Sequence, residues 1–228
     1  MDFFGDGERL VMESYESIDE EITCKESRSV YDFFKRLMDV VLSLIAAIML
    51  MPIFLIIAIA IKSESKGKVI FVQERIGYRG KKFKMYKFRS MVSNAEELKI
   101  KLLDKNEMGG PMFKMKDDPR VTKVGKFIRK TSIDELPQIF NVIKGEMSLV
   151  GPRPSLPNEV EKFDDWMLDR LSVKPGLTCF WQVSGRNDIS FDEWMKLDIK
   201  YVKERNLFLD IKLILKTLLV FFGDEHAR

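Results

Sequence analysis

The stretch FIRKTSIDELPQIFNVIKGEMSLVGPRP, residues 127–154, gathers the side chains with the most chemistry in this chain. Its adjacent carboxylates, Asp134 and Glu135, stand at the start of a predicted helix. Free backbone N–H groups and the positive end of the helix dipole favour an ionised carboxylate or a bound phosphate there. Arg129 precedes the pair and Arg153 lies between two prolines, so we expect two guanidinium groups to converge on one anion.

These residue types indicate a phosphate-handling site. Asp134 is a candidate oxygen nucleophile, and Glu135, with or without Asp134, is a candidate ligand of Mg²⁺, which binds through one or two carboxylates together with substrate phosphates. The alternative is structural, because Ser132-x-x-Glu135 also fits a capping box that only starts a helix. Either way, the helix is predicted to end near Gly145.

The rest of the composition indicates that, if the protein is an enzyme, carboxylates carry its chemistry. The single histidine, His226, is the third-last residue of the sequence, which argues against a histidine-based triad or zinc site. The two cysteines, Cys24 and Cys179, are far apart in the sequence, and the first residues show no secretory signal. We therefore expect a reducing compartment.

Residues 40–61 form an apolar run in which Ser43 is the sole polar side chain. About 20 apolar residues are needed for a helix to cross a bilayer, so this run predicts a membrane helix, with a buried core helix as the alternative. Pro52 removes a backbone hydrogen bond past the middle of the run and predicts a kink. Because basic residues flank both ends, we expect a re-entrant helix that enters and leaves on the cytoplasmic face.

The next segment, residues 62–130, is strongly basic, with 20 Lys or Arg against eight Asp or Glu. Aromatic and β-branched residues in 69–72 and 83–88, separated by glycines, predict a β-hairpin with Phe83 and Met85 on its buried face. No nucleic-acid-binding motif accompanies the charge. Beside a membrane helix, anionic lipid headgroups are therefore the expected partner, with no nucleic acid.

The remaining segments are predicted to be structural. Residues 1–29 carry nine acidic against three basic side chains and predict a disordered tail. A packing helix is expected over 158–171, and a capping box at Ser190 predicts a second helix to about residue 205. The apolar run 207–222, interrupted by two lysines, predicts an interfacial amphipathic helix, with a core helix as the alternative.

Several of these stretches resemble the bacterial sugar transferases, the monotopic polyprenyl-phosphate phosphoglycosyl transferases. Residues 129–138 match that family's R-x-x-S-[LI]-D-E-L-P-Q run, and 141–154 match its following run through G-P-R-P. The KFRSM segment, 87–91, is similar to another family element. Residues 176–187 resemble its G-[LI]-T-G-x-x-Q-V-x-G-R-N motif, with Cys179 in place of the last glycine before Gln182.

The resemblance implies roles for individual residues. Asp134 and Glu135 correspond to the family's catalytic Asp-Glu pair. Gln182 and Arg186 are candidate nucleotide contacts, although a structural turn explains them nearly as well. The family's re-entrant helix is kinked at a Ser-Pro pair, which here reads Met51-Pro52, so the proline matches and the serine does not.

Together these observations predict a mainly helical α/β fold: an acidic tail (1–29), a re-entrant membrane helix (30–61) kinked at Pro52, and a compact cytoplasmic domain (62–228) with a small β-hairpin and interfacial helices. The implied activity is transfer of a sugar 1-phosphate from a UDP-sugar to undecaprenyl phosphate with Mg²⁺, releasing UMP through an aspartyl-phosphosugar intermediate. This would occur at the cytoplasmic face of the plasma membrane and start capsule, exopolysaccharide or glycoconjugate synthesis. A homodimer is a further expectation, and a non-catalytic adaptor that binds anionic lipids is the alternative function.

Overall fold

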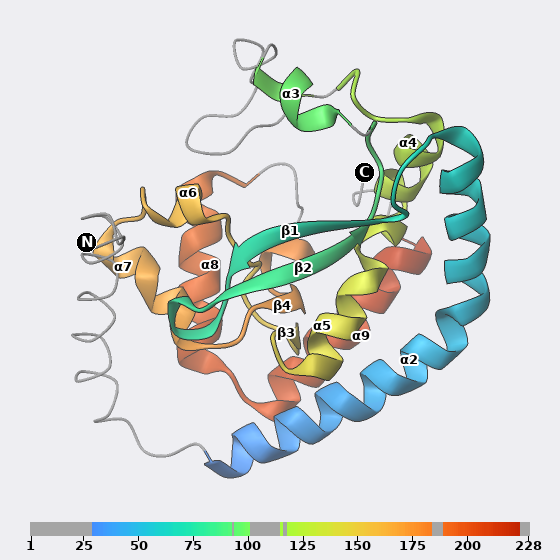
Figure 1. Ribbon diagram of the computed structural model, residues 1–228. Coiled ribbons are helices and arrows are strands. Elements are labelled where there is room, and N and C mark those ends of the chain that lie inside the picture. The colour runs from blue at the N-terminus through green and yellow to red at the C-terminus, as the bar shows by residue number, and fades with distance from the viewer. Residues whose placement is uncertain (1–28, 93, 101–114, 116–117, 184–188, 224–228) are drawn as a thin grey trace, which may run out of the picture.

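The computed structural model describes residues 29–92, 94–100, 115, 118–183 and 189–223. They form a mainly helical structure, as predicted, with two small two-stranded sheets (Figure 1). The predicted acidic tail, apart from Ser29, lies outside the described residues. In chain order the elements are α2 (Ser29–Glu64), β1 (Ile70–Ile76), η1 (Tyr78–Gly80), β2 (Lys82–Phe88), α3 (Ala95–Ile100), α4 (Lys123–Lys130), η3 (Ile133–Gln138), α5 (Ile139–Lys144), β3 (Ser148–Val150), α6 (Pro157–Val160), α7 (Asp165–Leu168), η4 (Asp169–Ser172), β4 (Gly176–Thr178), η5 (Trp181–Val183), α8 (Phe191–Glu204) and α9 (Leu207–Gly223).

The apolar run lies in α2, a single helix of 36 residues that contains Pro52. Figure 1 shows α2 as a curved helix that follows one side of the molecule. Only 11% of its most apolar 18-residue window is buried among the described residues, although the helix is long and apolar enough to cross a membrane. The alternative of a buried core helix is therefore contradicted, because such a helix would be mostly covered. The re-entrant course stays a prediction.

Both ends of α2 are attached to the rest of the fold by polar contacts. Near the N-terminal end, Arg36 donates hydrogen bonds of 2.6 and 2.8 Å to two carbonyls in the last turn of α5, and Lys35 forms a 3.0 Å ion pair with the buried Asp210 of α9. At the C-terminal end, Glu64 accepts from two N–H groups in the first turn of α4 at 2.7 and 2.9 Å. These contacts satisfy helix-terminal backbone groups that would otherwise need water.

The predicted hairpin is confirmed. β1 and β2 pair antiparallel, from Ile70 opposite Phe88 to Ile76 opposite Lys82, and the glycine-containing turn joins them. Phe83 and Met85 are buried, as the alternation predicts. The buried Asn141 side chain of α5 fastens β2 to the helix layer, since it donates to a β2 carbonyl at 2.8 Å and accepts from a β2 N–H at 3.1 Å.

A short parallel pair, β3 and β4, lies behind the hairpin and was not predicted as a pair. Its two backbones approach closely at Gly151 and Gly176. A Cβ atom on Gly176 would lie 2.1 Å from the Gly151 nitrogen, and one on Gly151 would lie 2.3 Å from the Lys174 carbonyl oxygen. Glycine is therefore required at both positions, because the two backbones lie too close together for a side chain. Gly151 lies directly after β3, so this contact also sets the path of the chain as it leaves that strand.

The single helix predicted over 158–171 is wrong. The structure divides this segment into α6, α7 and η4. A turn that ends at Asp164 lies between α6 and α7, and η4 follows α7 directly. Asp164 has extended backbone angles and occupies the N-cap position of α7. The Asp164 side chain makes no capping hydrogen bond, so the extended backbone before α7 interrupts the helix where the apolar spacing alone suggested a continuous one.

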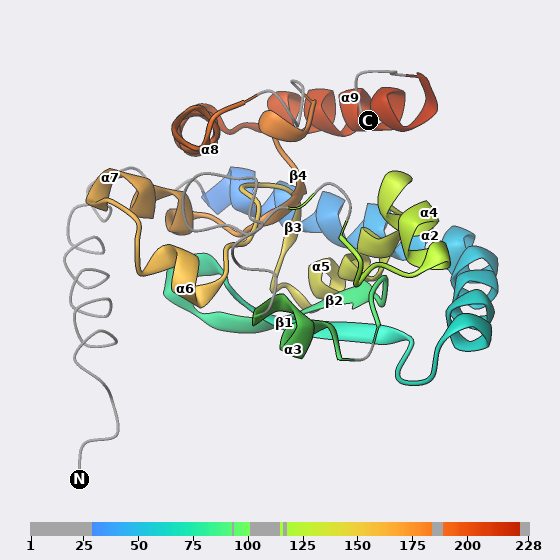
Figure 2. The same ribbon diagram turned by 90° about the horizontal axis from the view of Figure 1, so that it is seen from above.

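The two C-terminal helices form an outer layer, seen at the top of Figure 2. α8 begins at the predicted capping box of Ser190 and Glu193. α9 buries Asp210 and Leu213 on its inner face, whereas its outer face exposes large apolar side chains. These exposed side chains are Phe208, Ile211, Leu215, Leu218 and Leu219. An apolar outer face of this kind is typical of a helix at a membrane surface.

Candidate functional site

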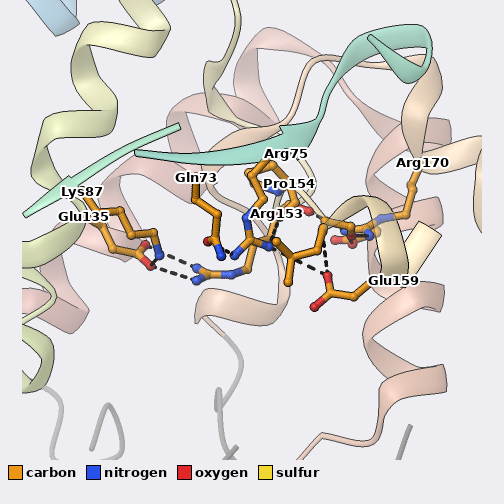
Figure 3. A network of polar contacts seen from close by, with 11 residues as sticks. Gln73, Arg75, Lys87, Glu135, Arg153, Pro154, Glu159 and Arg170 are labelled. Atoms are coloured by element: carbon orange, nitrogen blue, oxygen red, sulfur yellow. Dashed lines mark hydrogen bonds and ion pairs between the residues drawn. The ribbon is translucent and has the colours of Figure 1, made fainter. Parts of the chain in front are cut away.

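The Asp134–Glu135 pair lies in the first turn of η3, where this helix packs against β2. Glu135 Oε1 accepts hydrogen bonds of 2.9 Å from Lys87 Nζ, at the end of β2, and of 2.9 Å from Arg153 Nη2, in the loop after β3. A second, longer bond of 3.3 Å joins Arg153 Nη1 to Glu135 Oε2. Figure 3 shows these three side chains converging from three different elements.

The two carboxylates have opposite electrostatic settings. Burial opposes ionisation of Glu135, but the charges of Arg153 and Lys87 hold its pKa well below its usual range. For Asp134, burial and the neighbouring Glu135 charge raise the pKa to about 6, against the lowering effect of Lys87, Arg129 and Arg153. These charges favour the ionised form of Glu135, and Asp134, with a pKa of about 6, is ionised but comparatively basic near neutral pH. Adjacent carboxylates with separated pKa values are typical of catalytic pairs.

The capping-box alternative for Ser132 and Glu135 is wrong. Ser132 makes no side-chain capping bond and has a left-handed backbone with φ 54°. The Glu135 carboxylate is directed to Lys87 and Arg153. A non-glycine residue at positive φ costs free energy and is often found at functional sites. The predicted helix end is confirmed, since Gly145 caps α5 with φ 87°.

Arg153 is positioned through its own backbone by a buried arginine. Arg170 Nη2 donates to the Arg153 carbonyl at 2.7 Å and to Asp198 of α8 at 2.6 Å, and its other terminal nitrogen donates to Ser155. Arg170 and Asp198 are almost fully buried, so this ion pair is shielded from solvent. The loop that carries Arg153 is thereby tied to η4 and α8 (Figure 3).

A further arginine, Arg75 of β1, lies beside Arg153 (Figure 3). It donates to the Pro154 carbonyl at 3.1 Å and to the Gln73 side chain at 2.7 Å, and Glu159 lies 3.8 Å away. Burial and the charge of Arg153 lower the pKa of Arg75 to about 10. Two arginines held together in this way favour an anion between or beside them.

The other predicted site residues are distributed differently. Arg129 is exposed in the last turn of α4, and its charge lowers the pKa of Asp134. Gln182 is buried on η5, which packs against α8 and α9. Arg186 lies outside the described residues. The nucleotide contacts of Gln182 and Arg186 therefore stay predictions.

Sequence reasoning missed Lys87, Arg75 and Arg170. A signal for Lys87 was present, because it shares the odd-numbered face of β2 with the buried Phe83 and Met85. A lysine on the inward face of a strand needs a charged partner, and this one has Glu135. No comparable signal marks Arg170, which follows a segment whose helix breaks the sequence did not reveal.

The carboxylate oxygens of Asp134 and Glu135 are of the type that binds a magnesium ion. No group of three or more metal-binding side chains occurs within the part of the chain that the structure describes. Mg²⁺ does not require one, because it keeps several waters and binds through one or two carboxylates plus substrate phosphates. Glu135 Oε2 makes one long hydrogen bond and retains lone pairs. Burial, and after it the Glu135 charge, raises the pKa of Asp134, and a bound cation would offset both effects. The pair therefore fits Mg²⁺ bound together with a substrate.

A cavity of about 200 Å³ opens beside the pair, between η3, α5 and α9. Its lining is mostly aliphatic and also includes Ser132 and Glu135. The side chains that line it are Ser132, Glu135, Leu136, Ile139, Leu149, Leu177, Thr178, Ile214, Thr217 and Leu218. The site thus has a cationic side, formed by Lys87 and Arg153, and an apolar side.

Two features therefore characterise the described structure: an exposed apolar helix long enough to cross a membrane, and a carboxylate pair held among cations. Residues 30–224 match the family model of the bacterial sugar transferases, and the chain belongs to that family.

Three relatives illustrate the range of similarity. The galactosyl transferase CpsE of Streptococcus agalactiae is 50% identical over 197 residues, which cover 85% of this chain and 43% of the relative. The undecaprenyl-phosphate galactose phosphotransferase of Salmonella typhimurium is 45% identical over 199 residues, 86% of this chain and 42% of the relative. The exopolysaccharide production protein ExoY of Rhizobium meliloti is 40% identical over 195 residues, 84% of this chain and 86% of the relative. The chain therefore spans less than half the length of the first two relatives and most of the third.

Proposed function

We propose that this protein transfers a sugar 1-phosphate from a UDP-sugar to undecaprenyl phosphate and releases UMP. The observation that carries the proposal is the Asp134–Glu135 pair, in which one carboxylate is fixed as an anion by Lys87 and Arg153 and the other has a pKa of about 6. The names of two relatives supply the substrate class: the Salmonella protein is an undecaprenyl-phosphate galactose phosphotransferase, and a Klebsiella pneumoniae relative is a UDP-glucose:undecaprenyl-phosphate glucose-1-phosphate transferase.

In the first step, an Asp134 oxygen attacks the phosphorus that bears the sugar. A new Asp134 O–P bond forms as the bond from that phosphorus to the bridging oxygen breaks, and the electron pair leaves with UMP. Asp134 performs this attack as a carboxylate, which its pKa of about 6 permits at neutral pH. Arg153 and Arg129 stabilise charge on the phosphoryl oxygens.

In the second step, an oxygen of undecaprenyl phosphate attacks the same phosphorus. The new P–O bond forms as the Asp134 O–P bond breaks, which restores the carboxylate and yields a polyprenyl diphosphate sugar. Glu135 and Asp134 would hold Mg²⁺, which when bound neutralises charge on the diphosphate. Lys87 keeps Glu135 ionised and oriented throughout both steps.

We further propose that α2 is re-entrant and holds the site at the cytoplasmic face of the plasma membrane. The support is geometric, because contacts from Arg36 at one end of α2 and Glu64 at the other reach neighbouring helices of the same domain. A straight spanning helix would separate its ends by about 30 Å of hydrocarbon, and a domain on one side could not hold both. The exposed apolar face of α9 would then rest in the same leaflet.

The test is release of UMP by detergent-solubilised protein, screened over several UDP-sugars with undecaprenyl phosphate and Mg²⁺. We expect turnover with at least one sugar, and a loss of about a thousandfold or more in the Asp134→Asn variant. Asp165→Asn, which changes an exposed carboxylate outside the site, should retain full activity. Well-folded protein that releases no UMP with any UDP-sugar would refute the proposal and favour the non-catalytic adaptor.

A further inference from the structure

The cavity between α5 and α9 is chemically unlike the rest of the site. Its walls are formed by the aliphatic side chains of Ile139, Leu149, Leu177 and Ile214. The two threonines in the wall satisfy each other, since Thr178 and Thr217 are joined by a 2.6 Å hydrogen bond and Thr217 also donates to the Leu213 carbonyl at 2.7 Å. Because these hydroxyls are already paired, the wall offers little to a polar ligand.

The size and lining of the cavity argue against the nucleotide sugar. A site that buries a whole ligand of that size usually encloses about 300–1,000 Å³ and supplies polar groups to fix it. This cavity has about 200 Å³, and Lys87 and Arg153, the cations paired with Glu135, are not among the residues that line it. The nucleotide and its diphosphate are therefore matched to the Lys87 and Arg153 side, and the cavity to a fragment of hydrocarbon.

The cavity also leads toward the apolar outer face of α9. Leu218 lines it and is 49% exposed, so this side chain belongs to both surfaces. Leu215 and Leu219, adjoining on the same helix, are exposed as well. Figure 2 shows α9 in the outermost layer of the described structure. A hydrocarbon chain leaving the cavity along α9 would pass from protein to lipid over apolar side chains.

We propose that this cavity binds the isoprene units next to the phosphate of the polyprenyl phosphate acceptor. The inference rests on the proposed function and assigns the acceptor subsite within it. Occupancy of the cavity would bring the acceptor phosphate to Glu135 and Asp134 from the α9 side, while the donor occupies the cationic side. The two substrates would then use different walls of one site, as a two-step transfer through Asp134 allows.

The first experiment separates the two half-reactions in the Ile214→Trp variant, whose indole would fill the cavity. We expect the UMP burst without acceptor to remain within twofold of the wild type, and the KM for undecaprenyl phosphate to rise at least tenfold. A short C10 prenyl phosphate should suffer the same increase, because it carries the units that the cavity holds. The control Phe208→Trp, at an exposed position near the start of α9 and outside the cavity lining, should change neither value.

An unchanged KM for both acceptors in Ile214→Trp would overturn the proposal. An increase for the long acceptor alone would also overturn it, since that result indicates altered partition into the bilayer. Wild-type protein without any UMP burst would instead be a failure of the proposed function, which is a separate outcome.

A second experiment uses the wild-type protein, so it does not depend on how a variant folds. A prenyl phosphate with a diazirine on its first isoprene units is irradiated with the protein in nanodiscs, and labelled peptides are mapped. We expect labels on residues 214–218 that excess undecaprenyl phosphate removes. Labels confined to α2, or labels that undecaprenyl phosphate does not displace, would refute the assignment.

Discussion

At the scale of single residues, the proposed chemistry depends on two neighbouring carboxylates with different surroundings. Lys87 and Arg153 reach Glu135, whereas burial and the neighbouring Glu135 charge raise the pKa of Asp134 to about 6. The identity of this pair could be predicted from its sequence context. The partners of the pair could be predicted only in part. Arg153 could be predicted because it lies between two prolines, whereas the role of Lys87 depends on the direction in which its side chain points from β2. Lys87 and Glu135 lie 48 residues apart in the sequence, so their pairing depends on the fold and could not be predicted from sequence spacing.

The raised pKa predicts an acid limb in the rate of the first half-reaction. Asp134 must be ionised to attack, so the rate of the UMP burst should be half-maximal near pH 6 and fall about tenfold per pH unit below that value. Rapid-quench measurements between about pH 5 and pH 8 provide the check. A rate that stays flat at the acid end of this range would show that Asp134 titrates like an ordinary aspartate, or that another group attacks.

The same pKa predicts that Asp134→Asn stabilises the fold. The folded pKa is raised above the unfolded value of 3.8, so the ionised carboxylate costs stability above about pH 6, and this cost disappears as the pH falls toward 3.8. Without Mg²⁺ at about pH 7.5, the variant should therefore gain about 1–3 kcal/mol, a rise of a few degrees in Tm. The gain should shrink at about pH 5. A lower Tm at both pH values would contradict the assigned charge state of the site.

At the scale of elements, local signals predicted some parts well and others poorly. The hairpin, the end of α5 at Gly145 and the start of α8 at Ser190 each follow from two or three residues with a strong local preference. The β3–β4 pair escaped prediction because each strand has three residues and their pairing joins distant segments. The break before α7 escaped prediction because the apolar residues of 158–171 keep a partly helical spacing across it.

The β3–β4 contact predicts a large effect for one added methyl group. In Gly176→Ala, the new Cβ would lie 2.1 Å from the Gly151 nitrogen, and the backbone cannot yield as a flexible side chain would. We expect a loss of about 1–3 kcal/mol in the free energy of unfolding, measured as a lower Tm. Lys162→Ala, at an exposed position, serves as the control and should change Tm little. A Gly176→Ala variant as stable as the wild type would show that the two strands can separate without cost.

At the scale of the whole molecule, the arrangement of α2 and α9 relates the site to the membrane. Composition was sufficient to predict an apolar membrane helix, because residues 40–61 are long and apolar enough to match the hydrocarbon core of a bilayer. It was not sufficient to predict how the helix is held. The contacts of Arg36 with α5 and of Glu64 with α4 involve residues that look like ordinary flanking charges in the sequence.

The re-entrant course predicts same-side labelling of two positions, one in the first turn of α2 and one just beyond its last residue, Glu64. Single cysteines replace the exposed Val30 and Lys68 in a Cys24→Ser background. Cys179 can stay, because burial raises the pKa of its thiol well above the usual range and suppresses the reactive thiolate. In right-side-out spheroplasts, an impermeant maleimide should label neither cysteine until the cells are lysed. Labelling of just one of the two in intact spheroplasts would indicate a spanning helix.

The central claim, that Asp134 carries the phosphosugar between donor and acceptor, is tested most directly by mass spectrometry of the protein. Enzyme is mixed with an accepted UDP-sugar and Mg²⁺ without acceptor, quenched, and digested. We predict an adduct of one sugar phosphate on the peptide that contains Asp134, formed with one equivalent of UMP, absent in Asp134→Asn and discharged by undecaprenyl phosphate. Release of UMP only when undecaprenyl phosphate is present, with no adduct at any time, would contradict the covalent intermediate and indicate direct transfer between the two substrates.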